Sequence, residues 1–232
     1  MQLYPAILTD SIQEAQSQVV SIASVPNIRT VQVDIIDGLF ADNITLTPLD
    51  LHEVDFGELS CDLHLMTEEP LDFVYEAIDG NTVNYDEAKN DVITTKVPVR
   101  AIIGQIERMS NQVEFLQAIK GQNWQAGLSL DLYTPLDEIE PDAWLMVDII
   151  QLMGIEAGFQ GQTFNQHVFE KIEELQQHIE KFDRPVEVIV DGGLTPALAP
   201  KLQKLGVHGV AVGSSLWNEE DARNAAETYS QE

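Results

Sequence analysis

Short apolar runs rich in β-branched residues alternate along the chain with longer segments whose apolar positions recur every three or four residues. The short runs are typical of buried strands, and the three-to-four spacing is typical of amphipathic helices. The pattern predicts eight strands, over Leu3–Leu8, Arg29–Asp34, Cys61–Met66, Val97–Ile103, Trp124–Leu130, Ala143–Leu152, Val186–Val190 and Gly209–Val212. Between and after these strands it predicts helices over Ser11–Ala23, Glu69–Ile78, Ser110–Lys120, Phe164–Phe182, Pro196–Leu205 and Glu219–Tyr229.

The regular alternation of strand and helix predicts an α/β fold. Strands that alternate with helices indicate βαβ units and a parallel sheet. Eight such strands favour a closed (β/α)8 TIM barrel over an open doubly wound sheet, and roughly 250 residues is the usual size of that barrel. We therefore interpret residues 1–232 as one barrel domain. The stretch from Asp79 to Lys96 is polar and lacks periodicity, so we interpret residues 79–96 as an insertion before the fourth strand.

Two aspartates stand at equivalent places, each at the end of a predicted strand and shortly before glycine. Asp34 ends the second strand and precedes Gly38, while Asp191 follows the seventh strand and precedes Gly192. Because α/β barrels carry their chemistry at the carboxyl ends of the strands, the two carboxylates suggest an acid and a base that face one substrate. Each aspartate alone could equally cap a turn.

Glycine-rich turns follow three of the late strands. Glycine lets the backbone approach a ligand closely and adopt positive φ, so that several amides can converge on an anion. Barrels commonly bind phosphate at the loops after their seventh and eighth strands. We therefore predict a phosphate-binding cradle at Gly158, Phe159, Gln160, Gly161, Gly192, Gly193, Gly213 and Ser214.

The chain is strongly acidic, with 39 acidic and 12 basic residues and a net charge of −27. Such a balance argues against nucleic-acid binding, which needs a basic surface, but it leaves room for a small phosphorylated ligand held by backbone amides. General solubility and adaptation to high salt both remain explanations of the acidity. No apolar stretch approaches the roughly 20 residues of a membrane span, and the N-terminus lacks a signal-peptide pattern. We expect a cytoplasmic protein without membrane association.

Several motifs, taken in order, resemble those of the ribulose-phosphate 3-epimerase family, and the resemblance runs through most of the chain. A single V-D-G-G motif would be weak support, but the ordered set is specific. The matching segments are Asp34-Ile35-Ile36-Asp37-Gly38-Leu39-Phe40, Asp62-Leu63-His64-Leu65-Met66, Gly158-Phe159-Gln160-Gly161-Gln162-Thr163-Phe164, Val190-Asp191-Gly192-Gly193 and Val212-Gly213-Ser214.

The resemblance implies an isomerase of carbohydrate metabolism, in the pentose phosphate pathway, that interconverts D-ribulose 5-phosphate and D-xylulose 5-phosphate. In that family one aspartate removes the C3 proton to give a cis-enediolate, and a second returns a proton on the opposite face. By position, Asp34 and Asp191 would be this pair. They would also bind one divalent metal ion (Zn, Fe, Mn or Mg) together with His64 and Gln32. His64 and the glycine turns would contact the phosphorylated sugar, and a homo-oligomer is implied.

The chain departs from the family pattern inside this predicted site. Gln32 stands where the family has a metal-binding histidine, Ala6 where it has a serine, and Gln105 where it has the histidine of an H-x-E segment. An amide in place of imidazole favours harder ions such as Mg²⁺ or Mn²⁺ over zinc or iron. One hypothesis is a sugar-phosphate 3-epimerase with an altered metal site. The alternative is a sugar-phosphate-binding barrel with lost or altered activity, as a non-enzymatic sensor or a hexulose-phosphate 3-epimerase.

Overall fold

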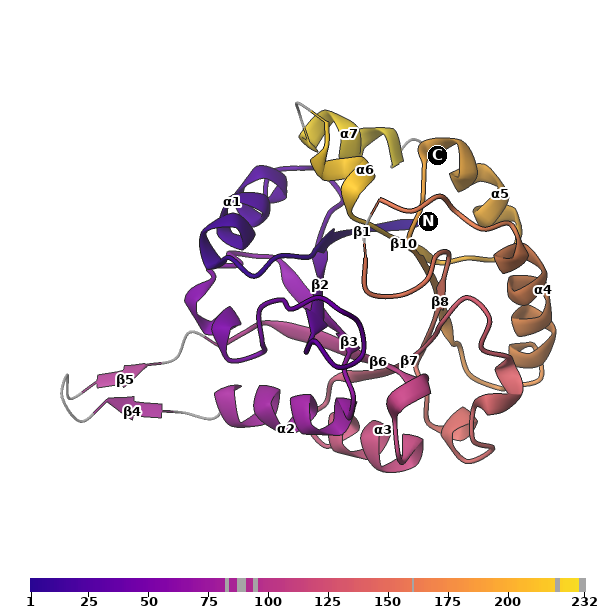
Figure 1. Cartoon of the computed structure of the whole chain (residues 1–232), viewed down its shortest axis with the longest axis horizontal. Helices are drawn as coiled ribbons and strands as arrows, with labels where there is room; N and C mark the ends of the chain where they lie inside the picture. The colour runs from indigo at the N-terminus through magenta and orange to yellow at the C-terminus, as the bar shows by residue number, and fades with distance from the viewer. Residues whose placement is uncertain (82–83, 87–90, 94–95, 160, 220–221, 230–232) are drawn as a thin grey trace.

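Eight parallel strands form a closed barrel, as the sequence predicts (Figure 1). A computed structural model describes the chain apart from residues 82–83, 87–90, 94–95, 160, 220–221 and 230–232. Around the barrel the strands follow the order β1-β10-β9-β8-β7-β6-β3-β2. Their bounds are β1 Gln2–Ile7, β2 Thr30–Ile36, β3 Ser60–Met66, β6 Val99–Gln105, β7 Gln125–Leu130, β8 Ile149–Met153, β9 Glu187–Asp191 and β10 Gly209–Val212.

Helices surround the barrel and connect successive strands (Figure 1). Two of them begin with a side-chain cap, in which Ser11 accepts from the Glu14 amide and Asn111 from the Glu114 amide. The helices are α1 Ile12–Ile22, α2 Pro70–Asn81, α3 Gln112–Lys120, α4 His167–Ile179, α5 Ala199–Lys204, α6 Ser214–Trp217 and α7 Ala222–Tyr229. Short 3-10 turns are η1 Asp50–Glu53, η2 Ile106–Arg108, η3 Leu136–Glu138, η4 Ala143–Leu145 and η5 Pro196–Leu198.

The strand predicted over Ala143–Leu152 is wrong in its first half. Residues Ala143–Leu145 form η4, and β8 begins only at Ile149. The Glu140 carbonyl accepts from the amides of Ala143 and Trp144, which closes the turn. Apolar residues fill both the turn and the strand, so hydrophobicity alone could not separate them.

Between α2 and β6 the chain leaves the barrel. Strands β4 (Asn84–Asp86) and β5 (Asp91–Ile93) pair with each other in antiparallel fashion and project from the body of the protein (Figure 1). They form a sheet of their own and add no strand to the barrel. Within the described ranges, no helix is long and apolar enough to cross a membrane.

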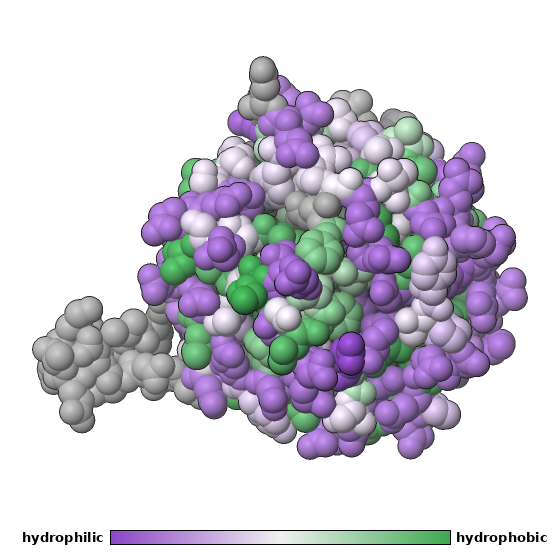
Figure 2. Space-filling view, viewed as in Figure 1, coloured by the Kyte–Doolittle hydropathy of each residue, from purple (hydrophilic) through white to green (hydrophobic). Residues whose placement is uncertain are grey.

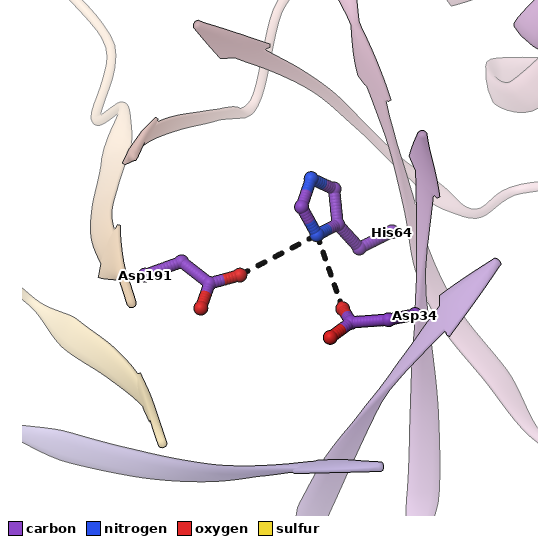
Figure 3. Close-up of side chains that lie close together, drawn as sticks. All are labelled: Asp34, His64 and Asp191. Atoms are coloured by element: carbon purple, nitrogen blue, oxygen red, sulfur yellow. Dashed lines mark hydrogen bonds and ion pairs between the residues drawn. The ribbon is translucent and has the colours of Figure 1, made fainter. Parts of the chain in front are cut away.

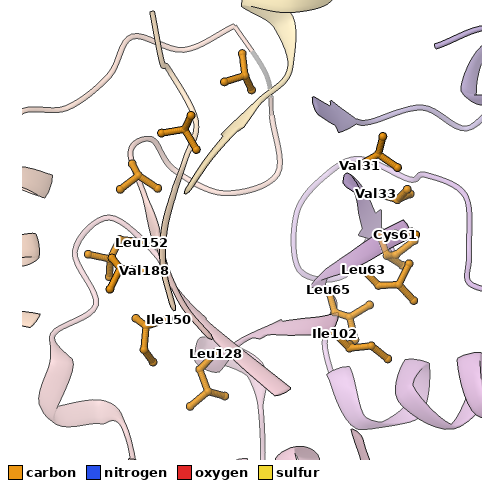
Figure 4. Packing of buried hydrophobic residues seen from close by; sticks show 14 of the residues in the cluster. Val31, Val33, Cys61, Leu63, Leu65, Ile102, Leu128, Ile150, Leu152 and Val188 are labelled. Carbon is orange, nitrogen blue, oxygen red and sulfur yellow. The ribbon is translucent and has the colours of Figure 1, made fainter. Parts of the chain in front are cut away.

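The core has one layer outside the barrel and one inside it. Along each strand successive side chains alternate between the helices and the barrel axis. The outer set, which includes Val31, Leu63, Ile102 and Leu128, packs beneath the helices (Figure 4). Inside the barrel a smaller apolar cluster comprises Tyr4, Ala6, Ala101, Ile103, Ile149, Ile189 and Ala211. Buried polar side chains share this interior, and they make up the candidate site described next.

Candidate active site

Asp34, His64 and Asp191 converge inside the barrel from three strands (Figure 3). The register of the sheet pairs Asp34 on β2 with His64 on β3, whereas Asp191 ends β9. His64 Nδ1 lies 3.1 Å from Asp34 Oδ1 and 3.4 Å from Asp191 Oδ2. One ligand atom from each side chain lies within 4.8 Å of the other two. The structure therefore brings together the two predicted acid–base residues and the predicted third metal ligand.

Burial and mutual charge shift the titration of this group. Burial raises the pKa of Asp34, the hydrogen bond from His64 opposes that rise, and the charge of Asp191 adds to it. Burial alone would lower the pKa of His64, but hydrogen bonds to Asp191 and Asp34 raise it to about 9. In the metal-free protein at neutral pH the imidazole is therefore protonated between the two carboxylates.

Gln32 connects the two aspartates. Its Nε2 donates to Asp34 Oδ1 at 2.8 Å and to Asp191 Oδ2 at 2.7 Å, and lies 3.4 Å from His64 Nδ1. Gln151 on β8 also donates to Asp191 Oδ2, at 3.0 Å, while its own Oε1 is buried and has no hydrogen-bond partner among the described residues. Gln151 was not among the site residues predicted from the sequence, although a glutamine inside an otherwise apolar strand was the available signal.

Gln105 on β6 fixes the ring of His64. Its hydrogen bonding is satisfied when Oε1 accepts from His64 Nε2 at 3.2 Å and Nε2 donates to Glu107 Oε2 at 2.9 Å. A proton held on Nε2 leaves Nδ1 directed at the two carboxylates. From the sequence, Gln105 was predicted only as a departure from the family pattern, without this contact.

The three converging side chains suit a divalent metal. Two carboxylate oxygens and an imidazole nitrogen are ligands that zinc, iron and manganese accept, and the second ring nitrogen is held by a neighbour, as metal-binding histidines usually require. Gln32 presents its amide to the same space and could contribute a neutral oxygen. We conclude that the residues fit such an ion.

A narrow hollow of about 40 Å³ lies over this group and opens toward the glycine turns. Asp34 and Asp191 line it together with the apolar side chains of Met66, Met153 and Ile155. The predicted cradle borders the same hollow, since its lining includes Gly158, Phe159, Gly161, Gly192, Gly193, Gly213 and Ser214. Gln160 lies outside the described residues. Several cradle residues also line an adjoining space of about 980 Å³.

The backbone of the cradle explains its glycines. Gly161, Gly192 and Gly193 have φ of +83°, +97° and +68°, in the region that favours glycine. A Cβ on Gly193 would lie 2.5 Å from the Phe164 nitrogen, so a larger residue would collide with the neighbouring backbone. Among the described lining residues of the two spaces there is no lysine or arginine. An anion there would be bound by amides and hydroxyls.

Apolar side chains lie among polar ones at the mouth of the barrel (Figure 2). Leu39 and Ile44, on the loop after β2, and Phe159, on the loop after β8, are 69%, 66% and 48% exposed. Asp37 fixes the loop after β2 by hydrogen bonds to backbone amides. Its Oδ1 accepts from the Leu39 amide and its Oδ2 from the Glu68 amide, both at 2.8 Å. Burial opposes the low pKa of Asp37, but these backbone hydrogen bonds keep it below its usual value.

Comparison with known proteins finds similarity over nearly the whole chain. The model of the ribulose-phosphate 3 epimerase family matches residues 2–217. The chain is 30% identical to the chloroplastic ribulose-5-phosphate-3-epimerase of Arabidopsis thaliana over 222 residues, covering 95% of this chain and 73% of that protein. It is 29% identical to the ribulose-phosphate 3-epimerase of Bacillus subtilis over 197 residues, covering 84% and 82% of the two chains.

Solved structures with little sequence similarity share the fold. The 3-hexulose-6-phosphate synthase of Salmonella typhimurium superimposes with a TM-score of 0.60 at 13% identity, covering 100% of this chain and 97% of that one. The tryptophan synthase alpha-subunit of Pyrococcus furiosus gives a TM-score of 0.64 at 13% identity, with 98% and 97% covered. At such identities the likeness concerns the fold alone.

Proposed function

The chain belongs to the ribulose-phosphate 3-epimerase family, and we propose that it is an isomerase that interconverts D-ribulose 5-phosphate and D-xylulose 5-phosphate. The observation that carries this proposal is the convergence of Asp34 and Asp191 on one narrow hollow. Their strands, β2 and β9, lie on different sides of the barrel. Two carboxylates placed in this way can reach opposite faces of one carbon atom, as inversion at C3 requires.

Proton transfer between these carboxylates and C3 accounts for the reaction. One carboxylate removes the C3 proton, and the electron pair that remains is delocalised into the neighbouring ketone to give an enediolate. The other carboxylic acid then delivers a proton to the opposite face, which inverts C3. Burial raises the pKa of Asp34, which makes its carboxylate a stronger base than an exposed aspartate.

We propose that Asp34, His64 and Asp191, with Gln32, hold a divalent metal beside the reacting carbon. The ion would act as a Lewis acid that stabilises negative charge developing on the substrate oxygens. The amide of Gln32 favours harder ions such as Mg²⁺ or Mn²⁺ over zinc or iron. Met66, Met153 and Ile155 line the hollow beside the carboxylates, and their apolar side chains would shield the reacting carbon from water.

The phosphate of the substrate would bind at the glycine turns. Gly193, Gly213 and Ser214 line both the narrow hollow and the larger adjoining space. Backbone amides bind phosphate without a cationic side chain, which suits a lining without lysine or arginine among its described residues. This arrangement would place the sugar chain along the hollow, with C3 near Asp34 and Asp191.

A hexulose 6-phosphate is the second candidate substrate. The adjoining space of about 980 Å³ leaves room for one more carbon, and Ala6 is smaller than the serine of the family pattern. Inversion at C3 would use the same two carboxylates. A protein that only binds sugar phosphates would need neither carboxylate, so the convergence of both favours an enzyme.

A coupled epimerase assay on D-ribulose 5-phosphate, after metal stripping and add-back of single divalent ions, tests the proposal. We expect turnover that depends on the added ion. If no added ion gives turnover while the folded protein still binds the sugar phosphate, the proposed function is wrong. Faster turnover of a hexulose 6-phosphate would instead identify the second candidate substrate.

A further inference from the structure

We propose that the side-chain amide of Gln32 reverses its orientation when the metal site is filled. In the metal-free protein its NH₂ group holds the two carboxylates together. When a divalent metal enters, the amide turns over and presents Oε1 to the ion. The inference rests on the metal site of the proposed function and assigns Gln32 a role in both states of that site.

The positions of four atoms support this role. Gln32 Nε2, Asp34 Oδ1, His64 Nδ1 and Asp191 Oδ2 form a compact group in which five of the six separations are between 2.7 and 3.4 Å. The sixth, between the two carboxylate oxygens, is at most 4.8 Å. A tetrahedral zinc ion with bonds of about 2.1 Å separates its ligand atoms by about 3.4 Å. The end of the Gln32 side chain therefore lies 2.7–3.4 Å from the other three atoms, as the fourth member of the group.

The charge inside the group decides which end of the amide faces inward. Without a metal, Oε1 would stand beside two carboxylate oxygens and repel them, whereas the NH₂ group offers one hydrogen to each. With a divalent cation in place, the same N–H groups would point at positive charge, and only Oε1 would be attracted. Reversal needs only a half-turn of the terminal torsion, which is broad and roughly two-fold in glutamine, so the backbone can stay in place.

The other three members of the group, Asp34, His64 and Asp191, are held by neighbours that need not move. Asp191 Oδ2 also accepts from Gln151 Nε2 at 3.0 Å, and His64 Nε2 donates to Gln105 at 3.2 Å. The main-chain oxygen of Asp34 accepts from Thr45 Oγ1 at 2.7 Å. Among the described hydrogen bonds of Gln32, every one is made inward to this group. The amide of Gln32 is therefore the part of the site that can adapt to the ion.

The experiment follows the Gln32 amide protons by NMR in the full chain, labelled with ¹⁵N-glutamine and ¹⁵N-histidine. The Gln32 signals are assigned with Gln32→Glu, which lacks this NH₂ pair, and Gln176 on α4 serves as a remote control. In metal-stripped protein we expect the Gln32 protons to exchange slowly with solvent. Addition of Zn²⁺ should shift both signals and raise their exchange rate, while the Gln176 signals stay in place.

A second measurement uses Gln32→Leu, which removes the NH₂ group and the oxygen together. We expect this variant to unfold at a lower temperature than the wild type without metal, because the two carboxylates then lose the N–H donor that they share. Zn²⁺ should raise its unfolding temperature less than it raises that of the wild type, since the ion then lacks the Oε1 ligand. Equal losses with and without Zn²⁺ would mean that Gln32 is only a structural core residue, which would overturn the inference.

The outcomes separate this inference from the proposed function. If Zn²⁺ shifts the His64 ring nitrogens but leaves the Gln32 protons slow to exchange and unshifted, the metal site stands and amide reversal is wrong. If neither residue responds to Zn²⁺ and calorimetry detects no binding of Zn²⁺, Mg²⁺ or Mn²⁺, the proposed metal site is wrong and the proposed amide reversal is wrong with it.

Discussion

His64 Nδ1 lies 3.1 Å from Asp34 Oδ1, because the register of β3 on β2 places the two residues directly opposite each other. The imidazole has no exposed surface, and the hydrogen bonds that it makes to Asp191 and Asp34 outweigh its burial. This contact links the stability of the metal-free protein to the protonation of the His64 ring.

The pH dependence of stability tests that relationship. The pKa of His64 is about 9 in the folded protein, against 6.5 as the ordinary value. A raised folded pKa gives stability that is fully present below pH 6.5 and is lost as pH rises through 9. The loss should be on the order of 3 kcal/mol. Urea unfolding of metal-stripped protein between pH 6 and 10 measures it, and His64→Gln should remove this part of the slope. Parallel curves for the two proteins would contradict the assignment.

Removal of either carboxylate should stop turnover without unfolding the barrel. We expect Asp34→Asn and Asp191→Asn each to lower kcat by about 10³-fold or more, because an amide cannot exchange a proton with C3. Steady-state kinetics measures the effect, and circular dichroism checks the fold. Turnover near that of the wild type in either variant would mean that the acid–base assignment is wrong.

Gly161 and Gly57 form a matched pair for the phosphate cradle. Both have positive φ, +83° and +57°, and a Cβ on either would meet no atom of the described residues within 4 Å. Alanine should therefore destabilise each by a similar amount, about 1 kcal/mol. Only Gly161 borders the hollows, so Gly161→Ala alone should raise the KM for the sugar phosphate, by about tenfold for one weakened amide contact. An unchanged KM in Gly161→Ala, or an equal rise in both variants, would count against the cradle.

Arg100 should matter for stability and not for turnover. Arg100 makes ion pairs with Asp62, on β3, and with Glu187, at the start of β9, the latter at 3.0 Å. Both partners lie away from the glycine turns. Burial raises the pKa of Asp62 to about 6 despite the opposing hydrogen bond and charge of Arg100. Arg100→Met should therefore destabilise the fold by about 3–5 kcal/mol.

The exposed Arg108, 3.8 Å from Glu68, provides the control for Arg100. Arg108→Met should change stability by less than about 1 kcal/mol. Denaturant unfolding compares the two variants, and kcat should stay at the wild-type value in both. A loss of kcat in Arg100→Met at a temperature where it remains folded would show that the cluster reaches the active site.

The sequence predicts the barrel well because eight apolar, β-branched strands alternate with amphipathic helices. It also predicts that Asp34 and Asp191 face one substrate, since parallel strands end at the same rim. The strand over Ala143–Leu152 was wrong in its first half because the apolar residues of a 3-10 turn lie only a few positions before those of the strand. The contacts of Gln105 and Gln151 could not be predicted, because they depend on which side chains meet across the barrel interior.

The most direct test of two-base epimerisation is to follow hydrogen at C3 by NMR while the enzyme works in D₂O. If Asp34 and Asp191 act on opposite faces, the acid that completes the inversion carries a solvent deuteron. Early D-xylulose 5-phosphate should then contain close to one deuterium at C3, while unreacted D-ribulose 5-phosphate keeps its proton. Product that retains the hydrogen of the substrate would show that one group serves both faces, and would contradict the account.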